Sequence, residues 1–261
     1  MGRRSESAGA GGGIAPEVLA LARSREPDRY LSALLSPAAA RGSLVAIAAF
    51  AAEMRRIPEI VSEPMIGEIR LQWWRDALAG DGGGAAGSPL AEALLAAKRQ
   101  FALPEGLLLV AIDQASDRLG QMTDDAEPGD AERQAAGLEA ALFGLAMRVL
   151  GAGYDDKGER AVTLAGDAYG RARARGRPLE KAALGGLMAR YEAARQAVAA
   201  LPARSRPAFL PLAVVPAYAA ARTAAQRGGA LSDVSPLSRI WALGLASIRG
   251  LPRGAGGPTG G

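Results

Sequence analysis

The pattern of apolar and polar positions reads as a succession of helices with short breaks. No stretch keeps the strict alternation of a half-buried strand. Ala is abundant and aromatic residues make up only 5% of the chain, a balance that favours helix over strand. The sequence therefore predicts an all-α fold. The predicted helices cover residues 16–24, 28–35, 37–57, 59–79, 89–101, 104–121, 130–151, 158–175, 178–200, 206–225 and 236–249.

Three of the breaks repeat one signal, a serine followed by a proline, at Ser36-Pro37, Ser88-Pro89 and Ser235-Pro236. Serine is a good N-cap and proline suits the first helical position, so each pair predicts a helix start. Residues 14–249 are expected to form a single helical domain, because no stretch inside them resembles a domain linker. The Gly-rich ends at 1–13 and 250–261 are expected to be disordered tails.

The composition excludes several kinds of chemistry. The chain has no Cys and no His, which rules out disulfides, thiolate nucleophiles, Ser-His-Asp triads and Cys- or His-ligated metals. Carboxylates, arginines and hydroxyls remain, together with a carboxylate-bound cation such as Mg²⁺. The net charge of +4 is too small to require a nucleic-acid partner. With no spanning segment and no secretory signal, we expect a cytoplasmic protein, with peripheral contact to the inner membrane left open.

The densest cluster of charge lies between Phe50 and Leu78, which contain four Glu, one Asp, four Arg and two of the three Trp. Glu59 and Glu63 are four residues apart and would share one helical face, with Glu53 a looser fit. Two carboxylates on one face can hold Mg²⁺, which commonly bridges to a diphosphate. The alternative is a solvated acidic face or pairing with neighbouring arginines.

The second half of this cluster reads GEIRLQWWRDAL. Ile69, Trp73 and Leu78 are expected to form one apolar stripe. Trp73 and Trp74 point about 100° apart on a helix, so they should not be equally buried. An exposed Trp beside Arg indicates a partner or ligand contact, and the alternative is a Trp that anchors two helices. The candidate partner surface consists of Glu68, Arg70, Trp73, Trp74, Arg75 and Asp76.

Two further segments carry candidate chemistry. Asp113 and Asp117 are also four residues apart, which suits a metal pair or a solvated face. The arginines between Arg171 and Arg177 suit a phosphate cradle, weak RNA or lipid contact, or a solvated helix end. The candidate phosphate contacts are Arg41, Arg56, Arg175 and Arg177.

Taken together, the segments resemble the squalene/phytoene synthase family. The similar stretches are DRYLSALLSPAAARGSLVAIAAF, the Glu-rich segment from Glu53, GEIRLQWWRDAL, and QAAGLEAALFGLAMRVLG followed by AGDAYG. They stand in the family's order over most of residues 28–180. GEIRLQWWRDAL looks like the subgroup that contains a mitochondrial complex I assembly factor and its bacterial relatives. The resemblance implies the all-α isoprenoid-synthase fold, whose enzymes join prenyl diphosphates head to head through two Asp-rich, Mg²⁺-binding motifs.

Both motifs depart from that pattern. Where the family has a run close to DDxxDE, this chain has Pro58-Glu59-Ile60-Val61-Ser62-Glu63. After AGDAYG the second acidic run of the family is missing, and RARARGRPL follows directly. Asp167 therefore lacks the further acidic residues of that motif. The expected function is therefore a non-catalytic assembly or interaction factor with a protein partner and no cofactor, and with a prenyl-lipid pocket left open. The alternative is a Mg²⁺-dependent head-to-head prenyl-diphosphate synthase that uses Glu53, Glu59, Glu63, Asp113, Asp117 and Asp167.

Overall fold

The structure is a computed structural model and describes residues 14–80, 85–121, 130–174, 181–226 and 234–253. In these residues the chain is helical and contains no strand, so the predicted all-α class is confirmed. The elements are α1 (Pro16–Arg25), α2 (Pro27–Leu34), α3 (Ala38–Ile60), α4 (Pro64–Ala79), α5 (Pro89–Phe101), α6 (Glu105–Gly120), α7 (Asp130–Val149), α8 (Asp156–Arg173), α9 (Lys181–Ala199), the 3-10 helix η2 (Ala203–Val214), α10 (Val215–Gln226) and α11 (Pro236–Arg249).

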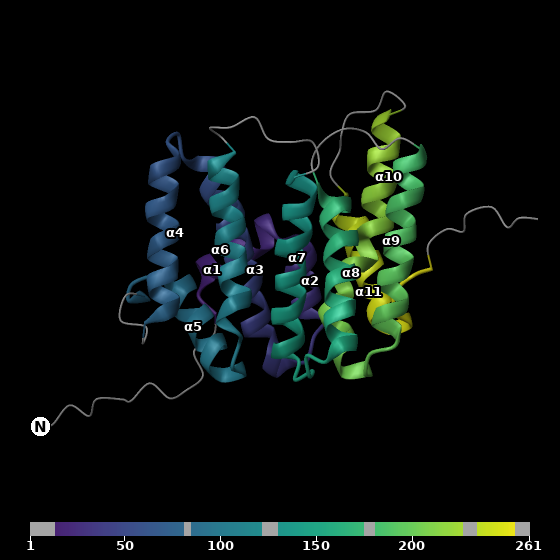
Figure 1. Cartoon of the computed structure of the whole chain (residues 1–261). Coiled ribbons are helices and arrows are strands. Elements are labelled where there is room, and N and C mark those ends of the chain that lie inside the picture. The colour runs from purple at the N-terminus through teal and green to yellow at the C-terminus, as the bar shows by residue number, and fades with distance from the viewer. Residues whose placement is uncertain (1–13, 81–84, 122–129, 175–180, 227–233, 254–261) are drawn as a thin grey trace, which may run out of the picture.

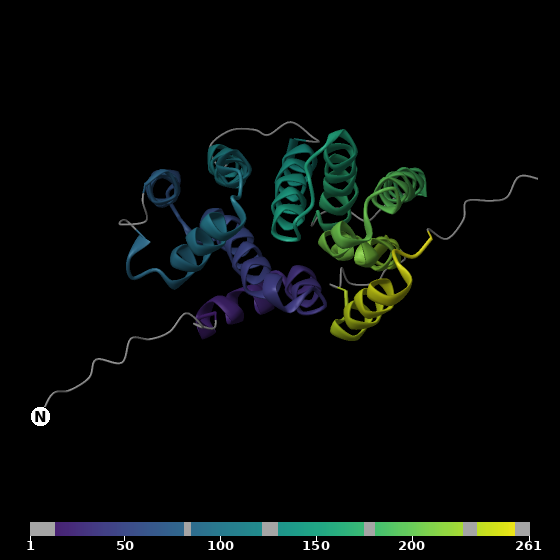
Figure 2. The ribbon, with the colours of Figure 1, turned by 90° about the horizontal axis from the view of Figure 1, so that it is seen from below.

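The helices form two layers. Figure 1 shows α4, α6, α7, α8 and α9 side by side, and the view from below in Figure 2 places α2, α3 and α11 on the other side of this row. The first predicted tail and residues 254–261 of the second lie outside the described residues, while Leu251 packs against the core and Pro252 O accepts a hydrogen bond from Tyr191. The single domain over 14–249 stays a prediction.

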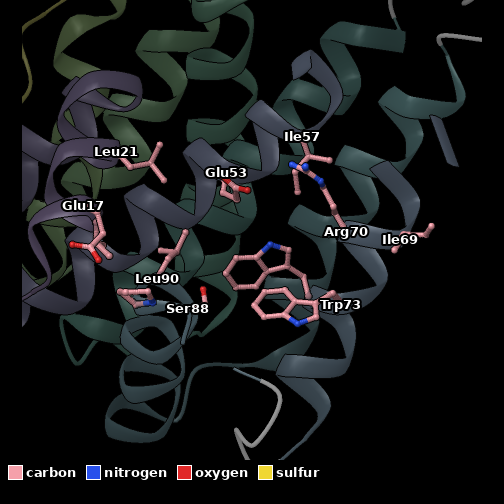
Figure 3. A pocket seen from close by; sticks show the side chains of 12 residues that line it. Glu17, Leu21, Glu53, Ile57, Ile69, Arg70, Trp73, Ser88 and Leu90 are labelled. Atoms are coloured by element: carbon pink, nitrogen blue, oxygen red, sulfur yellow. The ribbon is translucent and has the colours of Figure 1, made fainter. Parts of the chain in front are cut away.

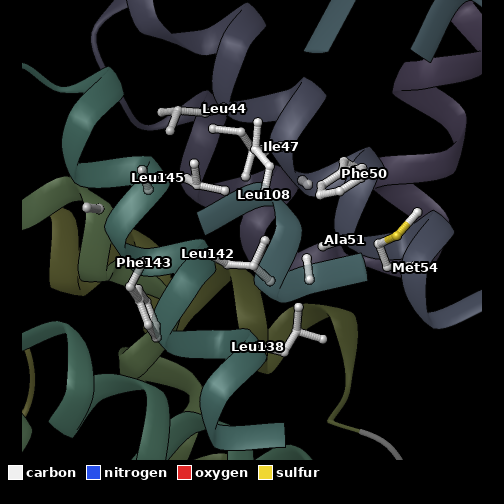
Figure 4. Close-up of a cluster of buried hydrophobic side chains, with 14 of the residues drawn as sticks. Leu44, Ile47, Phe50, Ala51, Met54, Leu108, Leu138, Leu142, Phe143 and Leu145 are labelled. Carbon is white, nitrogen blue, oxygen red and sulfur yellow. The ribbon is translucent and has the colours of Figure 1, made fainter. Parts of the chain in front are cut away.

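α3 is the central helix. Every residue from Ser43 to Ala52 is buried, because α1, α2, α5, α6 and α7 all pack around it. A helix that is apolar all round is stable only when it is covered on all sides. Figure 4 shows Leu44, Ile47 and Phe50 of α3 among the apolar side chains of α6 and α7.

Three local predictions about helix ends had different outcomes. The Ser88 and Ser235 side chains accept hydrogen bonds from Ala91 N and Ser238 N, as expected of N-caps. Ser36 does not cap α3: Pro37 takes the N-cap position, and Ser36 Oγ donates to the Ser32 carbonyl in the preceding helix.

The predicted helix at 206–225 is wrong in its first half. Residues Ala203–Val214 form the 3-10 helix η2, and α10 begins only at Val215. Pro207 and Pro211 lie inside η2, and proline lacks the N–H that α-helical hydrogen bonding needs. The chain therefore takes the tighter geometry there.

Candidate functional site

Five charged side chains meet in the interior where α2, α3, α7 and α8 come together. We call Glu26, Arg29, Arg55, Glu139 and Arg173 the ionic cluster. Arg55 Nε lies 2.8 Å from one oxygen of Glu26, and its Nη2 lies 2.6 Å from Glu139. Arg173 bonds both carboxylates, at 2.8 Å and 3.3 Å, and Arg29 bonds Glu139. Both Glu side chains are at most 1% exposed.

The cluster keeps its carboxylates charged despite their burial. Burial alone raises the pKa of Glu26, but the charges of Arg173, Arg55 and Arg29 outweigh burial and hold that pKa at about 2, against an ordinary 4.5. The same three arginines lower the pKa of Glu139. Because one partner alone would be a buried uncompensated charge, the five groups depend on one another.

Two glycines of the AGDAYG segment bring α7 and α8 close enough to form the cluster. A Cβ on Gly166 would lie 2.6 Å from Ala140 N, and one on Gly170 would lie 2.9 Å from backbone atoms of Ala135. Only glycine permits this backbone approach. The contact positions Glu139 of α7 beside Arg173 of α8.

A second buried group lies next to the cluster. Asp28 accepts hydrogen bonds from Tyr169 at 2.8 Å and Tyr218 at 2.7 Å, and Arg239 Nε lies 2.8 Å from its other oxygen. Burial and the nearby Asp28 carboxylate raise the pKa values of both tyrosines, so both remain protonated donors. Asp28 thus ties α8, α10 and α11 to α2.

A cavity of about 260 Å³ opens onto the ionic cluster between α3, α6, α7 and α8. We call it the central cavity. Among the described residues, its lining contains four arginines and two glutamates: Arg25, Arg55, Arg118, Arg173, Glu59 and Glu139. Neither a hydrogen bond nor an ion pair joins Arg118 to another described residue. Burial and the charge of Arg55 lower the pKa of the Arg118 guanidinium. The carbonyl oxygen of the Gln114 side chain is buried there and accepts no hydrogen bond from the described residues. The described part of the lining therefore carries a surplus of positive charge, which favours an anion over a cation.

The predicted pairing of Glu59 and Glu63 on one helical face is wrong. α3 ends at Ile60, Val61 is extended, and Glu63 is the N-cap of α4, so the two residues lie on different elements. Pro64 explains the break, because a proline disfavours helical geometry in the residue before it. Glu59 lines the central cavity and pairs with Arg25 at 2.8 Å.

The remaining candidate acids are dispersed. The Glu53 carboxylate accepts hydrogen bonds from Nε and Nη2 of Arg56, at 2.8 and 2.9 Å. Asp113 pairs with Arg75, and Asp167 pairs with Arg171 and Arg190. Asp117 lines a separate surface hollow beside α4.

These acids do not fit a magnesium site. Mg²⁺ needs several oxygen ligands around one point, and the described residues contain no group of three or more acids placed to hold a metal ion. The candidate phosphate contacts are also scattered. Arg41 donates a hydrogen bond to the Ser36 carbonyl, and Arg56 is paired with Glu53. Arg175 and Arg177 lie outside the described residues.

A second cavity, of about 570 Å³, runs along α4. We call it the α4 groove. Figure 3 shows Glu17 and Leu21 of α1 on one side of it and Arg70 and Trp73 of α4 on the other. Its lining is mostly apolar, and Met65, Ile66 and Ile69 are exposed on the same helix.

The predicted apolar stripe of α4 needs correction. Ile69 is 65% exposed, while the buried stripe consists of Gly67, Leu71, Trp74, Ala77 and Leu78. The tryptophans differ as expected, at 38% exposure for Trp73 and 4% for Trp74. The Trp74 ring packs edge-on against Phe50 at 5.2 Å, which makes it an anchor between α3 and α4 rather than part of an exposed surface.

Part of the predicted partner surface is used inside the molecule. Arg75 and Glu68 contact Asp113 and Ser116 of α6, and Asp76 accepts from Gln72 within α4. Arg70 and Trp73 remain exposed at the groove.

The sequence analysis missed Glu26, Arg29 and Glu139 altogether, and placed Arg173 in a possible solvated helix end. Glu26 and Arg173 lie 147 residues apart in the sequence, so no local spacing pattern predicts their contact. The sequence does show three charged residues, Glu26, Asp28 and Arg29, close together ahead of the apolar stretch of α3.

Comparison with known proteins places the chain near one family. A model of the squalene/phytoene synthase family matches residues 22–173. Three similar proteins are each named NADH dehydrogenase (ubiquinone) complex I, assembly factor 6. The Bos taurus protein is 33% identical over 156 residues, which are 57% of this chain and 45% of that protein. The Rattus norvegicus protein is 40% identical over 79 residues, 29% and 24% of the two chains. The Homo sapiens protein is 42% identical over 57 residues, 22% and 17%.

The chain thus spans less than half the length of the curated relatives it matches. No solved structure is significantly similar to it. None of the helices, within the described ranges, is long and apolar enough to cross a membrane.

Proposed function

The chain belongs to the squalene/phytoene synthase family, and we propose that it serves there as a non-catalytic assembly or interaction factor. The resemblance seen in the sequence and the all-α isoprenoid-synthase fold are confirmed. The mammalian relatives are named assembly factors of complex I, and we extend that role to this chain as contact with a protein of a respiratory complex.

One observation carries the proposal: the cavity that meets the ionic cluster is lined by arginines where prenyl transfer needs clustered acids. In prenyl transfer Mg²⁺ ions neutralise the departing diphosphate, and carboxylates must hold those ions. Here Glu59 is paired with Arg25, and Glu53 lines the other cavity, paired with Arg56. The remaining charge of the central cavity repels a divalent cation.

We assign the partner contact to the α4 groove. Its apolar lining with a few polar groups, together with exposed Met65, Ile69 and Trp73 along one helix, matches the composition of a contact surface. The groove also offers space for an apolar ligand such as a prenyl lipid.

A turnover assay tests the absence of catalysis. Folded protein is incubated with farnesyl or geranylgeranyl diphosphate and Mg²⁺ or Mn²⁺, with and without NADPH, and diphosphate release is followed. We expect no release above that of the variant with Glu59→Ala and Glu63→Ala. Release above this control would overturn the proposal in favour of a prenyltransferase.

A capture experiment tests the partner role. Wild-type chain should retain a subunit of a respiratory complex, identified by mass spectrometry, and the variant with Met65→Ser and Ile69→Ser should lose it. Ile240→Ser removes an apolar side chain of α11 that is 55% exposed and serves as the control. Equal capture by all three proteins would exclude the α4 groove as the contact.

A further inference from the structure

α11 is apolar on two opposite sides. Its inner side packs Leu243 and Ala246 into a small cluster with η2. Its outer side carries five large apolar side chains that are 44–84% exposed: Leu237, Ile240, Trp241, Leu245 and Ile248.

We call these five side chains the α11 face. No charged residue stands between Ile240 and Ile248, whereas the outward side of an ordinary surface helix is polar. α3 shows the usual outcome for an apolar helix, because its neighbours cover it on every side. Within the described ranges, the rest of the protein covers α11 on one side only. α2 packs against α11 and ends in two further exposed leucines, Leu34 and Leu35.

The charges of this segment have one sign. Residues 234–253 contain Arg239, Arg249 and Arg253 and no Asp or Glu. Arg239 is buried on Asp28, so it fixes the helix to the protein body. Arg249 and Arg253 are exposed at the C-terminal end of the helix. Any acidic headgroup beside this end would meet two free-standing positive side chains and no repelling carboxylate of the same segment.

We propose that the α11 face docks the protein on an anionic phospholipid surface. The helix lies flat, with its isoleucines and leucines at the boundary of the acyl chains, Trp241 at headgroup level, and Arg249 and Arg253 on lipid phosphates. An exposed apolar face with a central Trp, terminal arginines and no acid matches a lipid interface. A protein interface typically surrounds its apolar centre with a polar rim, whereas the charged residues of this segment are all positive. The proposal is independent of the partner role assigned to the α4 groove.

Vesicle flotation with the full chain tests the proposal. The protein should float with vesicles of phosphatidylcholine and phosphatidylglycerol, and more weakly with phosphatidylcholine alone. Replacing Trp241→Ser and Ile248→Ser should lower the partition coefficient by about 10-fold or more, because both side chains leave water on binding. Their exposure of 69% and 84% means that folding does not depend on them.

Two further variants separate apolar from electrostatic contributions. Met65→Ser with Ile69→Ser on α4, where exposure is 74% and 65%, is the matched control and should float as wild type does. Arg249→Gln with Arg253→Gln should remove the preference for anionic vesicles and the weakening of binding by salt.

The emission of Trp241 gives an independent readout. A blue shift on adding anionic vesicles should be present in wild type and absent in Trp241→Phe. Flotation that survives in the α11 variant, or that falls equally in the α4 control, overturns the proposal. A different result would also overturn it: wild type is a dimer in light scattering, the α11 variant is a monomer, and neither protein binds vesicles. The α11 face would then join two copies of this chain.

Discussion

Arg173 Nη1 lies 2.8 Å from Glu26 Oε2, although 147 residues separate the two along the chain. The contact links the last residue of α8 to the junction between α1 and α2, and it is shared with Arg55 and Glu139. The first and second halves of the family-matched region are thus joined by ionised groups inside the protein. Two consequences of this link for stability can be measured.

Acid should lower the free energy of unfolding because Glu26 loses its charge-dependent contacts. An unfolded Glu26 takes up a proton near pH 4.5, whereas the folded one stays charged to about pH 2. Its contribution to stability is therefore complete above pH 4.5 and is lost as the pH falls from there toward 2. Urea unfolding at a series of pH values should show the free energy of unfolding falling across this window.

Glu26→Gln tests the cause of that fall. The variant should lose about 3–5 kcal/mol at pH 7, because it leaves buried arginines uncompensated, and its stability should fall less steeply below pH 4.5. Glu59→Gln is the control: its pair with Arg25 is about half exposed, so the change should stay within about 1 kcal/mol. A Glu26→Gln protein with the wild-type pH slope would show that the cluster does not control acid stability.

Gly166→Ala should destabilise the contact between α7 and α8. The added Cβ would stand 2.6 Å from a backbone nitrogen, which cannot move aside as a flexible side chain can. We expect a loss of about 1–3 kcal/mol or more in thermal unfolding. Gly185→Ala in α9 is the matched control, since a Cβ there meets no atom within 4 Å. That variant should gain up to about 1 kcal/mol from helix propensity, and equal losses in both would argue against a tight α7–α8 contact.

The two neighbouring tryptophans should respond in opposite ways. Trp74→Ala removes a ring that is 4% exposed and packs on Phe50, so it should cost about 3–5 kcal/mol of stability. Trp73→Ala should cost much less stability and reduce partner capture at the α4 groove. Chemical unfolding measures the first effect and capture the second. A strongly destabilised Trp73→Ala variant would make Trp73 a core residue as well.

The sequence predicted what depends on near neighbours. The all-α class and most helix positions follow from composition and local pattern, and Ser88 and Ser235 cap their helices because an N-cap bond reaches only three residues ahead. The same reasoning failed at Ser36, where the preceding helix offers its own carbonyl. It failed at Glu63 because the four-residue spacing from Glu59 was interpreted as one helical face, although Pro64 disfavours helical geometry at Glu63.

The candidate site was harder to predict, because its partners are distant in the chain. Glu59 was identified by its type, but its ion pair comes from Arg25, on another helix. Glu139 is one polar residue in an apolar stretch of sequence, and its three arginine partners come from α2, α3 and α8. Spacing within one segment cannot show such an arrangement, since side chains from four helices create it.

The surplus of arginines around the central cavity has a practical consequence for experiments on this protein. Four guanidinium groups and two carboxylates make the described part of the lining electropositive, so the anion of the buffer should affect measurements on this protein. An anion that enters the cavity binds only the folded chain and stabilises it by mass action. Melting temperatures measured in phosphate should therefore exceed those measured in chloride at equal ionic strength, and comparisons between laboratories should hold the anion constant.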